Sequence, residues 1–281
     1  MNFITFIHTL IARIVIDSFE VLKFTSLVMK QSYENLLQFM SELTMEVSSV
    51  LSTTESRDGD ERKPSFGCTY HFFAKEDTSV DSLFNEIPRI VTHINDSACM
   101  VLKGFYRSLL KDGDSVLDLM SSWVSHLPED INYSKVSAQG MNKVELETNP
   151  QLTDFIVQNL NTNQVLPYKD EEFDLCTIAV SVQYLTSPVR VFEEIARVLK
   201  PNGKCCVSFS NRMFPTKAIL AWRMSSNQDH CNLVSQYFKK TEMFAEVKVE
   251  RLVEENGNYD PLLAFIGPKK SPEGHVSSTF T

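Results

Sequence analysis

The sequence predicts a doubly wound α/β fold, in which helices cover both faces of a mostly parallel sheet. Short apolar runs of strand length alternate with amphipathic stretches of helix length, and the connections between them are short. One run, residues 173–180, is apolar almost throughout, which is typical of a parallel strand buried on both faces. These features together indicate repeated strand–helix–strand units.

The 281 residues are enough to bury a sizeable core, and the charge balance narrows the class of partner. The chain has 27 Lys and Arg against 36 Asp and Glu, a net charge of −9. It therefore lacks an overall basic field that would attract nucleic acid or an anionic membrane. We expect a small-molecule substrate and no nucleic acid. The sequence does not indicate the oligomeric state.

The cysteines form no C-x-x-C pair and no cluster with His at the spacing of metal ligands. We therefore expect reduced thiols that pack as small hydrophobes, and no metal site. The six are Cys68, Cys99, Cys176, Cys205, Cys206 and Cys231.

Residues 1–52 contain no Gly or Pro and repeat apolar residues at helical spacing, which predicts an N-terminal helical extension. The extension can pack on the main domain, serve as a mitochondrial or plastid targeting segment, or make peripheral membrane contact through residues 1–30. The localisation thus stays open between cytoplasm and organelle, and no transmembrane helix is expected. A linker at 53–66, a main domain at 67–267 and a disordered tail at 268–281 complete the predicted organisation.

The main domain is predicted to begin with one or two helices over residues 80–110. Pro88 fits a first helical turn. An apolar stripe at helical spacing would lie against the sheet; its members are Ile90, Ile94, Ala98, Val101, Phe105 and Leu109. His93 lies on this segment, and a packed or capped role is expected for it before a chemical one.

Residues 115–126 are predicted to carry the first buried strand into a turn and then a helix. In doubly wound folds that turn is where a nucleotide-like cofactor binds. Asp118 interrupts the apolar run, and a carboxylate there costs free energy unless it has a partner. It therefore indicates an acid that braces the turn or faces a ligand.

The later elements follow from apolar runs and from helix start and stop signals. Asn142 and Glu145 have the spacing of a capping box, and Pro188 and Gly203 bracket a helix and the turn after it. Strands are expected at 136–139, 155–158, 173–180, 204–209, 247–253 and 262–266, and helices at 142–146, 188–199 and 232–240.

Four strings in this order resemble the class I S-adenosylmethionine-dependent methyltransferases, and most closely the type 11 group. They are Val-Leu-Asp-Leu at 116–119, Leu-Pro-Tyr-Lys-Asp-Glu-Glu-Phe-Asp at 166–174, Val-Gln-Tyr-Leu at 182–185, and Glu-Ile-Ala-Arg-Val-Leu-Lys-Pro-Asn-Gly at 194–203. The resemblance covers about residues 80–267. It implies a Rossmann-like sheet of seven strands with the last antiparallel, and S-adenosyl-L-methionine bound across the carboxyl ends of the first, second and fourth strands.

Two departures from the family pattern fall on the expected cofactor site. The family's ribose-binding acid at the end of the second strand corresponds to Gly140, which has no side chain. The family's glycine-rich turn is replaced by residues 120–124, Met-Ser-Ser-Trp-Val. Two accounts fit. In the first, a divergent site binds the same cofactor through Ser121, Ser122 and backbone amides, while Asn142 or Gln139 contacts the ribose and Asn159 the adenine amine. In the second, the fold is kept as a scaffold and the site no longer binds the cofactor.

The resemblance and the predicted positions together define a set of candidate site residues. Those expected at the cofactor are Asp118, Ser121, Ser122, Trp123, Gly140, Asn142, Asn159, Leu160, Ser181 and Gln183. His126 and Tyr184 are the catalytic candidates, since a hydroxyl or acidic-carbon acceptor needs a base, and His93 is a third. Trp123 either covers the cofactor or packs in the core. Arg212 and Lys217 either bind an anionic group of the acceptor or are solvated.

The expected function is therefore methyl transfer from S-adenosylmethionine to a small-molecule or lipid-like acceptor. The alternative is a catalytically inactive binding or assembly protein that keeps the methyltransferase fold. A nicotinamide-dependent enzyme is disfavoured, because the chain contains no G-x-G-x-x-G string.

Overall fold

The computed structural model describes residues 72–254 and 260–271. The chain divides into two units, residues 1–64 and 65–281, and every described residue belongs to the second. The predicted N-terminal extension, the linker at 53–66, Cys68 and the end of the tail lie outside the described residues. Their predicted roles stay predictions.

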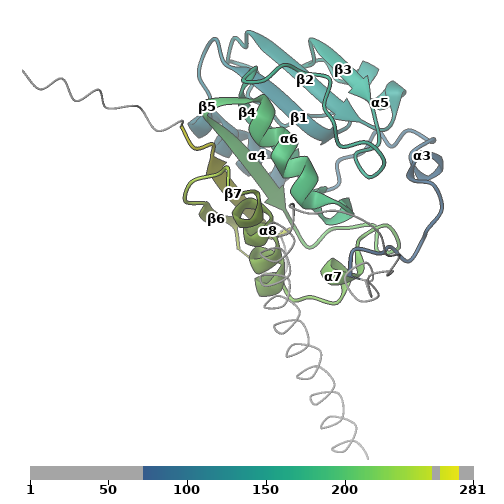
Figure 1. Cartoon of the computed structure of the whole chain (residues 1–281). Coiled ribbons are helices and arrows are strands. Elements are labelled where there is room, and N and C mark those ends of the chain that lie inside the picture. Colours follow the sequence, from purple (N-terminus) through teal and green to yellow (C-terminus); the bar gives the residue numbers. More distant parts are fainter. Residues whose placement is uncertain (1–71, 255–259, 272–281) are drawn as a thin grey trace, which may run out of the picture. The chain divides into compact units, whose positions relative to one another are not determined.

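The second unit is built on a single sheet of seven strands in the order β3-β2-β1-β4-β5-β7-β6 (Figure 1). The strands are β1 (Ser115–Ser121), β2 (Lys135–Gly140), β3 (Asp154–Val157), β4 (Phe173–Ala179), β5 (Leu199–Phe209), β6 (Lys248–Val253) and β7 (Leu262–Pro268). β1 to β5 pair in parallel, and β7 is antiparallel to both of its neighbours. The predicted class, a doubly wound and mostly parallel sheet of seven strands, is confirmed. The strand order reverses between β1 and β4, where such sheets open a crevice.

Helices cover the two faces of this sheet. They are α3 (Asp81–Phe84), α4 (Asp96–Leu109), α5 (Lys143–Thr148), α6 (Pro188–Val198), α7 (Leu220–Arg223) and α8 (Asn227–Thr241), with a 3-10 turn, η1 (Val182–Tyr184). α6 and α8 pack on one face with Leu117 and Leu119, and α4 packs on the other face with Val116. The alternation along β1 thus assigns neighbouring residues to opposite cores. Cys205 and Cys206 divide in the same way, and both are buried, as predicted for small hydrophobes.

The segment before the first strand differs from the prediction. Residues 85–95 are irregular, so Pro88 does not open a helix, and α4 begins only after Asn95, whose Oδ1 accepts the N–H of Ala98 at 2.9 Å. The buried stripe repeats every fourth residue, at Ile94, Ala98, Leu102, Tyr106 and Leu110. Of the predicted stripe, Ile94 and Ala98 are buried, and Phe105 and Leu109 pack partly buried against the same core. Ile90 and Val101 were wrongly predicted to be buried: they are 45% and 39% exposed.

The helix expected after the first strand is also absent. Residues 122–134 contain no helix, and this loop instead buries Leu127 and Ile131 against the α4 side of the sheet. β1 itself runs on to Ser121, two residues past the predicted start of the turn. Met120 and Ser121, the first two residues of the expected turn at 120–124, are therefore part of the strand.

Two further boundaries differ in extent. β5 begins at Leu199, because Leu199 already pairs with Phe173 of β4. α8 begins at Asn227 because Ser226 and Asp229 form a capping box, a start signal upstream of the predicted one.

Candidate functional site

A cavity of about 310 Å³ lies at the carboxyl ends of β1, β2 and β4. Its walls come from the end of β1 and the loop after it, the start of α5, the segments after β3 and β4, and the loop after β5. Residues 75–94, which precede α4, supply a further wall. The position is the switch point of the sheet, where doubly wound folds bind their ligands. Its volume is at the lower end of the range for small-molecule sites.

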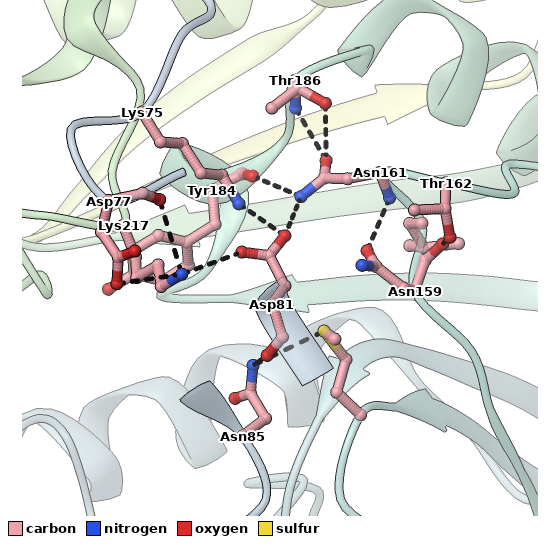
Figure 2. A network of polar contacts seen from close by, with 12 residues as sticks. Lys75, Asp77, Asp81, Asn85, Asn159, Asn161, Thr162, Tyr184, Thr186 and Lys217 are labelled. Atoms are coloured by element: carbon pink, nitrogen blue, oxygen red, sulfur yellow. Dashed lines mark hydrogen bonds and ion pairs between the residues drawn. The ribbon is translucent and has the colours of Figure 1, made fainter. Parts of the chain in front are cut away.

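Residues 72–95 lie over this cavity and are called here the strap. Lys217, from the loop after β5, fastens it: the Lys217 Nζ donates to the carbonyl and the hydroxyl of Ser79 at 2.9 and 3.0 Å. The same Nζ is 3.1 Å from a carboxylate oxygen of Asp77 (Figure 2). Hydrogen bonds from Ser79, together with Lys217, lower the pKa of Asp77 to about 2. Lys217 is only 3% exposed, so the prediction that it is solvated is wrong.

A second fastening joins the strap to the segments after β3 and β4. Asp81 accepts hydrogen bonds from Lys75 Nζ at 2.7 Å and from Asn161 Nδ2 at 3.0 Å. Asn161 also donates to the carbonyl of Tyr184 and accepts the N–H of Thr186 (Figure 2). These bonds to Lys75 and Asn161 lower the pKa of Asp81 against the opposing effect of burial. The strap is thus held by charge-assisted hydrogen bonds at these two contacts.

The end of β1 is bulged. Met120 has a positive φ of 55°, and the pairing of β1 with β2 shifts register between Leu119 and Ser121. The side chain of Gln139 stabilises the bulge, since its Oε1 accepts the N–H of Met120 at 2.9 Å. After the bulged strand the chain continues into the loop at residues 122–134, which contains no helix.

Asp118 lies under this bulge and is 2% exposed. Its carboxylate accepts hydrogen bonds from the hydroxyls of Ser121, at 2.6 Å, and Thr177, at 2.8 Å. Burial raises the pKa of Asp118 to about 6, although these hydroxyls oppose the shift. The carboxyl both braces the turn and lines the cavity, so the two roles weighed for it coincide.

Glu145 is a further carboxylate of the cavity wall, at the first turn of α5. Asn142 caps this helix as predicted, its Oδ1 accepting the N–H of Glu145 at 3.1 Å. The Glu145 side chain does not return to the cap, however. It accepts the N–H of Arg89 in the strap at 2.7 Å and the hydroxyl of Ser122 at 2.6 Å.

The structure brings ten of the twelve predicted site residues to the cavity. These are Asp118, Ser121, Ser122, Trp123, His126, Asn142, Asn159, Leu160, Ser181 and Tyr184. Gly140 and Gln183 lie outside it. Gln183 is fully buried and donates from Nε2 to the carbonyls of Val180 and Arg212.

The candidate bases differ in their electrostatics. Burial lowers the pKa of His126 to about 4, so its imidazole is neutral at pH 7. Burial raises the pKa of Tyr184, so its hydroxyl keeps its proton, and the hydroxyl oxygen accepts the N–H of Phe214 at 2.8 Å. Desolvation also lowers the pKa of His93. Of the two catalytic candidates, His126 can therefore accept a proton, as a weak base, and Tyr184 can donate a hydrogen bond.

An aromatic wall gathers around Phe214. The ring centroids of Phe84 and His93 lie 5.2 and 5.4 Å from that of Phe214, both edge-on, and Tyr184 lies at 6.3 Å. The guanidinium of Arg89 lies 4.3 Å from the centroid of Phe84. Such a wall suits a planar or apolar ligand group.

Arg212 and Lys217, the two residues proposed to bind an anionic group, already have partners within the protein. Arg212 Nε is 2.7 Å from the buried carboxylate of Asp260, and Lys217 is committed to the strap. In the described ranges, no three His, Cys, Asp or Glu side chains come together in a way that could hold a metal ion. The same residues include no helix that is long and apolar enough to span a membrane.

Of the strap residues, only His93 was among the candidates for the site. Lys75, Asp81, Phe84, Arg89 and Glu145 all line the cavity and were not among the candidates. The first four come from a segment whose relation to the cavity depends on contacts distant in sequence. Glu145 was assigned to a capping box alone.

The topology and the polar cavity at its switch point define a Rossmann-like α/β domain. In a comparison with known protein families, residues 121–207 match the family model described as "Methyltransferase domain". The predicted resemblance to methyltransferases is thereby supported over residues 121–207 of the main domain.

Curated relatives match over part of their length. "Ubiquinone/menaquinone biosynthesis C-methyltransferase UbiE" of Bartonella quintana is 36% identical over 87 residues, which are 31% of this chain and 32% of the relative. "Demethylmenaquinone methyltransferase" of Paenarthrobacter aurescens is 29% identical over 153 residues, 50% of this chain and 59% of the relative. Across the relatives found, the matched share runs from 13% to 65% of their own length.

Solved structures also match. A SAM-dependent methyltransferase from Aquifex aeolicus is 18% identical, with a TM-score of 0.44 over 62% of this chain and 94% of that one.

Proposed function

We propose that this protein transfers a methyl group from S-adenosylmethionine to a small-molecule or lipid-like acceptor. The observation that carries the proposal is the cavity at the ends of β1, β2 and β4, about half of whose lining residues lie in the segment that matches a methyltransferase domain. The predicted cofactor residues that meet there come from four separate stretches of the chain. Such convergence of predicted cofactor residues is not expected of a chance packing defect.

The polar groups of the cavity fit the proposed cofactor. The hydroxyl of Ser181 is buried at the cavity wall and has no hydrogen-bond partner within the described structure. A buried hydroxyl without a partner costs free energy, which a ligand group would recover. Ser181, Asn159 and Leu160 would hold the cofactor at the ends of β3 and β4. When bound, the cofactor supplies an activated methyl group on a sulfonium.

The chain's own contribution is alignment and removal of a proton. Holding the acceptor atom in line with the methyl carbon lowers the barrier by several kcal/mol in well-oriented reactions. The aromatic wall of Phe84, Phe214 and Tyr184 would orient the acceptor, and the Tyr184 hydroxyl would donate a hydrogen bond to it. His126 would take the proton that a hydroxyl or carbon acceptor loses, since its imidazole is neutral.

Two observations support a lipid-like acceptor. Five apolar side chains of the strap are exposed: Val80 (60%), Leu83 (63%), Ile87 (74%), Ile90 (45%) and Val91 (57%). Apolar exposure of this extent beside a pocket is typical of surfaces that meet membranes, lipids or other proteins. The relatives named above are a C-methyltransferase of ubiquinone and menaquinone biosynthesis and a demethylmenaquinone methyltransferase. A planar ring with an apolar substituent fits both observations.

The alternative is an inactive methyltransferase-fold protein, and the bulge of β1 favours it. Met120 and Ser121 occupy the position of the glycine-rich turn, and residues 122–134 form no helix whose amino end would face the ligand. A domain altered in this way could retain the fold for binding or assembly alone.

Isothermal titration separates the two functions. The purified chain is titrated with S-adenosylmethionine and with S-adenosylhomocysteine. We expect saturable binding of both, with a Kd below about 1 mM. The absence of detectable heat from either compound at millimolar concentration would favour the inactive protein.

A further inference from the structure

We propose that Glu145 accepts the hydrogen bonds of the ribose diol of the adenosyl ligand. The inference rests on the proposed function and goes beyond it, since it names a residue for a contact that the sequence leaves without an acid. It follows from three observations on the groups around the end of β2.

First, the end of β2 has no room for a side chain. A Cβ on Gly140 would lie 2.5 Å from the carbonyl oxygen of Ser121 and 3.0 Å from Leu146 Cδ2. The carbonyl belongs to the backbone of the bulged strand and has little freedom to move. An acid at position 140 is therefore incompatible with the bulge.

Second, the two amides considered for the ribose are already engaged. Asn142 donates from Nδ2 to the carbonyls of Asn85 and Glu86, at 2.7 and 3.1 Å, while its Oδ1 caps α5. Gln139 accepts from Met120 and donates to the carbonyl of Gln158 at 2.6 Å. Turning either amide toward a ligand would leave backbone groups without partners, at a cost of about 1–3 kcal/mol each.

Third, Glu145 is a carboxylate of the cavity wall with acceptor capacity to spare. Each of its oxygens accepts one hydrogen bond, Oε1 from Arg89 N–H and Oε2 from the Ser122 hydroxyl. An ionised carboxylate offers about four acceptor sites, so two remain. None of the ion pairs found among the described residues involves Glu145. The 2.6 Å bond from Ser122 is a hydroxyl–carboxylate contact of the kind a ribose would make.

The test compares two ligands on matched variants. S-adenosylhomocysteine and its 2′-deoxy analogue are titrated into the full chain, the variant Glu145→Gln and the control Glu147→Gln. Glu147 lies on the same short helix but is exposed and faces Lys143, so it controls for the loss of one negative charge. The amide oxygen introduced by Glu145→Gln can still accept the N–H of Arg89, which preserves the attachment of the strap.

We expect Glu145→Gln to weaken binding of S-adenosylhomocysteine by about 10- to 50-fold and binding of the 2′-deoxy analogue by less than threefold. Glu147→Gln should leave both affinities unchanged. A second readout needs no variant to fold. The unaltered chain should bind S-adenosylhomocysteine more than tenfold more tightly than its 2′-deoxy analogue. Equal weakening of both ligands by Glu145→Gln would overturn the inference alone. Failure of the unaltered chain to bind S-adenosylhomocysteine would overturn the proposed function together with it.

Discussion

Ser121 and Gly140 are register partners in β1 and β2, and the carbonyl oxygen of Ser121 fills the space that a side chain at position 140 would need. The absence of the family's acid at position 140 and the absence of the glycine-rich turn therefore have the same structural cause, the extension of β1. Once β1 extends through a bulge to Ser121, the residue beside it must be glycine. The two departures seen in the sequence are therefore not two independent arguments for an inactive site.

The first prediction tests this relationship. Gly140→Ala should destabilise the fold by about 2–4 kcal/mol, since the new methyl group meets backbone and the core residue Leu146. Gly104→Ala is the control: Gly104 lies within α4 with nothing within 4 Å of its Cβ position, and alanine there should stabilise the helix by about 0.5–1 kcal/mol. Urea unfolding measures both. If the two substitutions change the free energy of unfolding equally, the Ser121 carbonyl can move to make room for a side chain at position 140.

The second prediction concerns pH. The pKa of Asp118 is raised to about 6 in the folded chain, from 3.8 when unperturbed, so the folded state binds a proton that the unfolded state has lost between those values. The free energy of unfolding should therefore fall as pH rises through this window, by about 3 kcal/mol in total. Asp118→Asn should remove that part of the dependence. Denaturant unfolding at pH 4.5, 5.5 and 7.0 measures the difference, and parallel curves for the two proteins would contradict the assignment.

The third prediction concerns the strap. Lys217→Met should leave Asp77 and Ser79 without their buried partner and destabilise the protein by about 3 kcal/mol. Lys143→Met, at an exposed pair with Glu147, should change stability by less than about 0.5 kcal/mol. Limited proteolysis should cut residues 72–95 faster in Lys217→Met than in the control. An unchanged cutting rate would mean that other contacts hold the strap.

The fourth prediction concerns the proposed base. His126→Gln should lower the methyl-transfer rate by about 10²- to 10⁴-fold while leaving the affinity for S-adenosylhomocysteine within threefold. Because the pKa of His126 is about 4, its neutral form is complete above pH 5.5, and the rate should show no histidine limb between pH 6 and 8. A histidine limb below pH 6.5 that disappears in His93→Gln would assign the proton transfer to His93 instead.

The strands were predictable because their signal is local. The apolar runs at 136–139, 155–158 and 173–180 end within two residues of β2, β3 and β4. The stripe of α4 was harder: Val101 is apolar but exposed, so it obscured the period set by Ala98, Leu102 and Tyr106.

The walls of the site were predictable only where they follow the sheet. Parallel strand ends meet at one edge, so Asp118, Asn159 and Ser181 converge from their positions alone. The strap does not follow from any local pattern. Its bonds join Lys217 to Ser79 and Arg89 to Glu145 across 138 and 56 positions of the chain. The spacing of Asn142 and Glu145 correctly predicted the helix cap but not the carboxylate's partners.

The most direct test is whether an adenosyl ligand enters the cavity that Trp123 lines. The chain has two tryptophans, and Trp222 is buried against His230, with ring centroids 4.0 Å apart. Fluorescence should therefore report the cavity through Trp123. We expect a saturable change on adding S-adenosylhomocysteine, no such change with NAD, and loss of the change in Trp123→Phe. A signal that stays constant to millimolar S-adenosylhomocysteine, or that responds to NAD alone, would contradict the account.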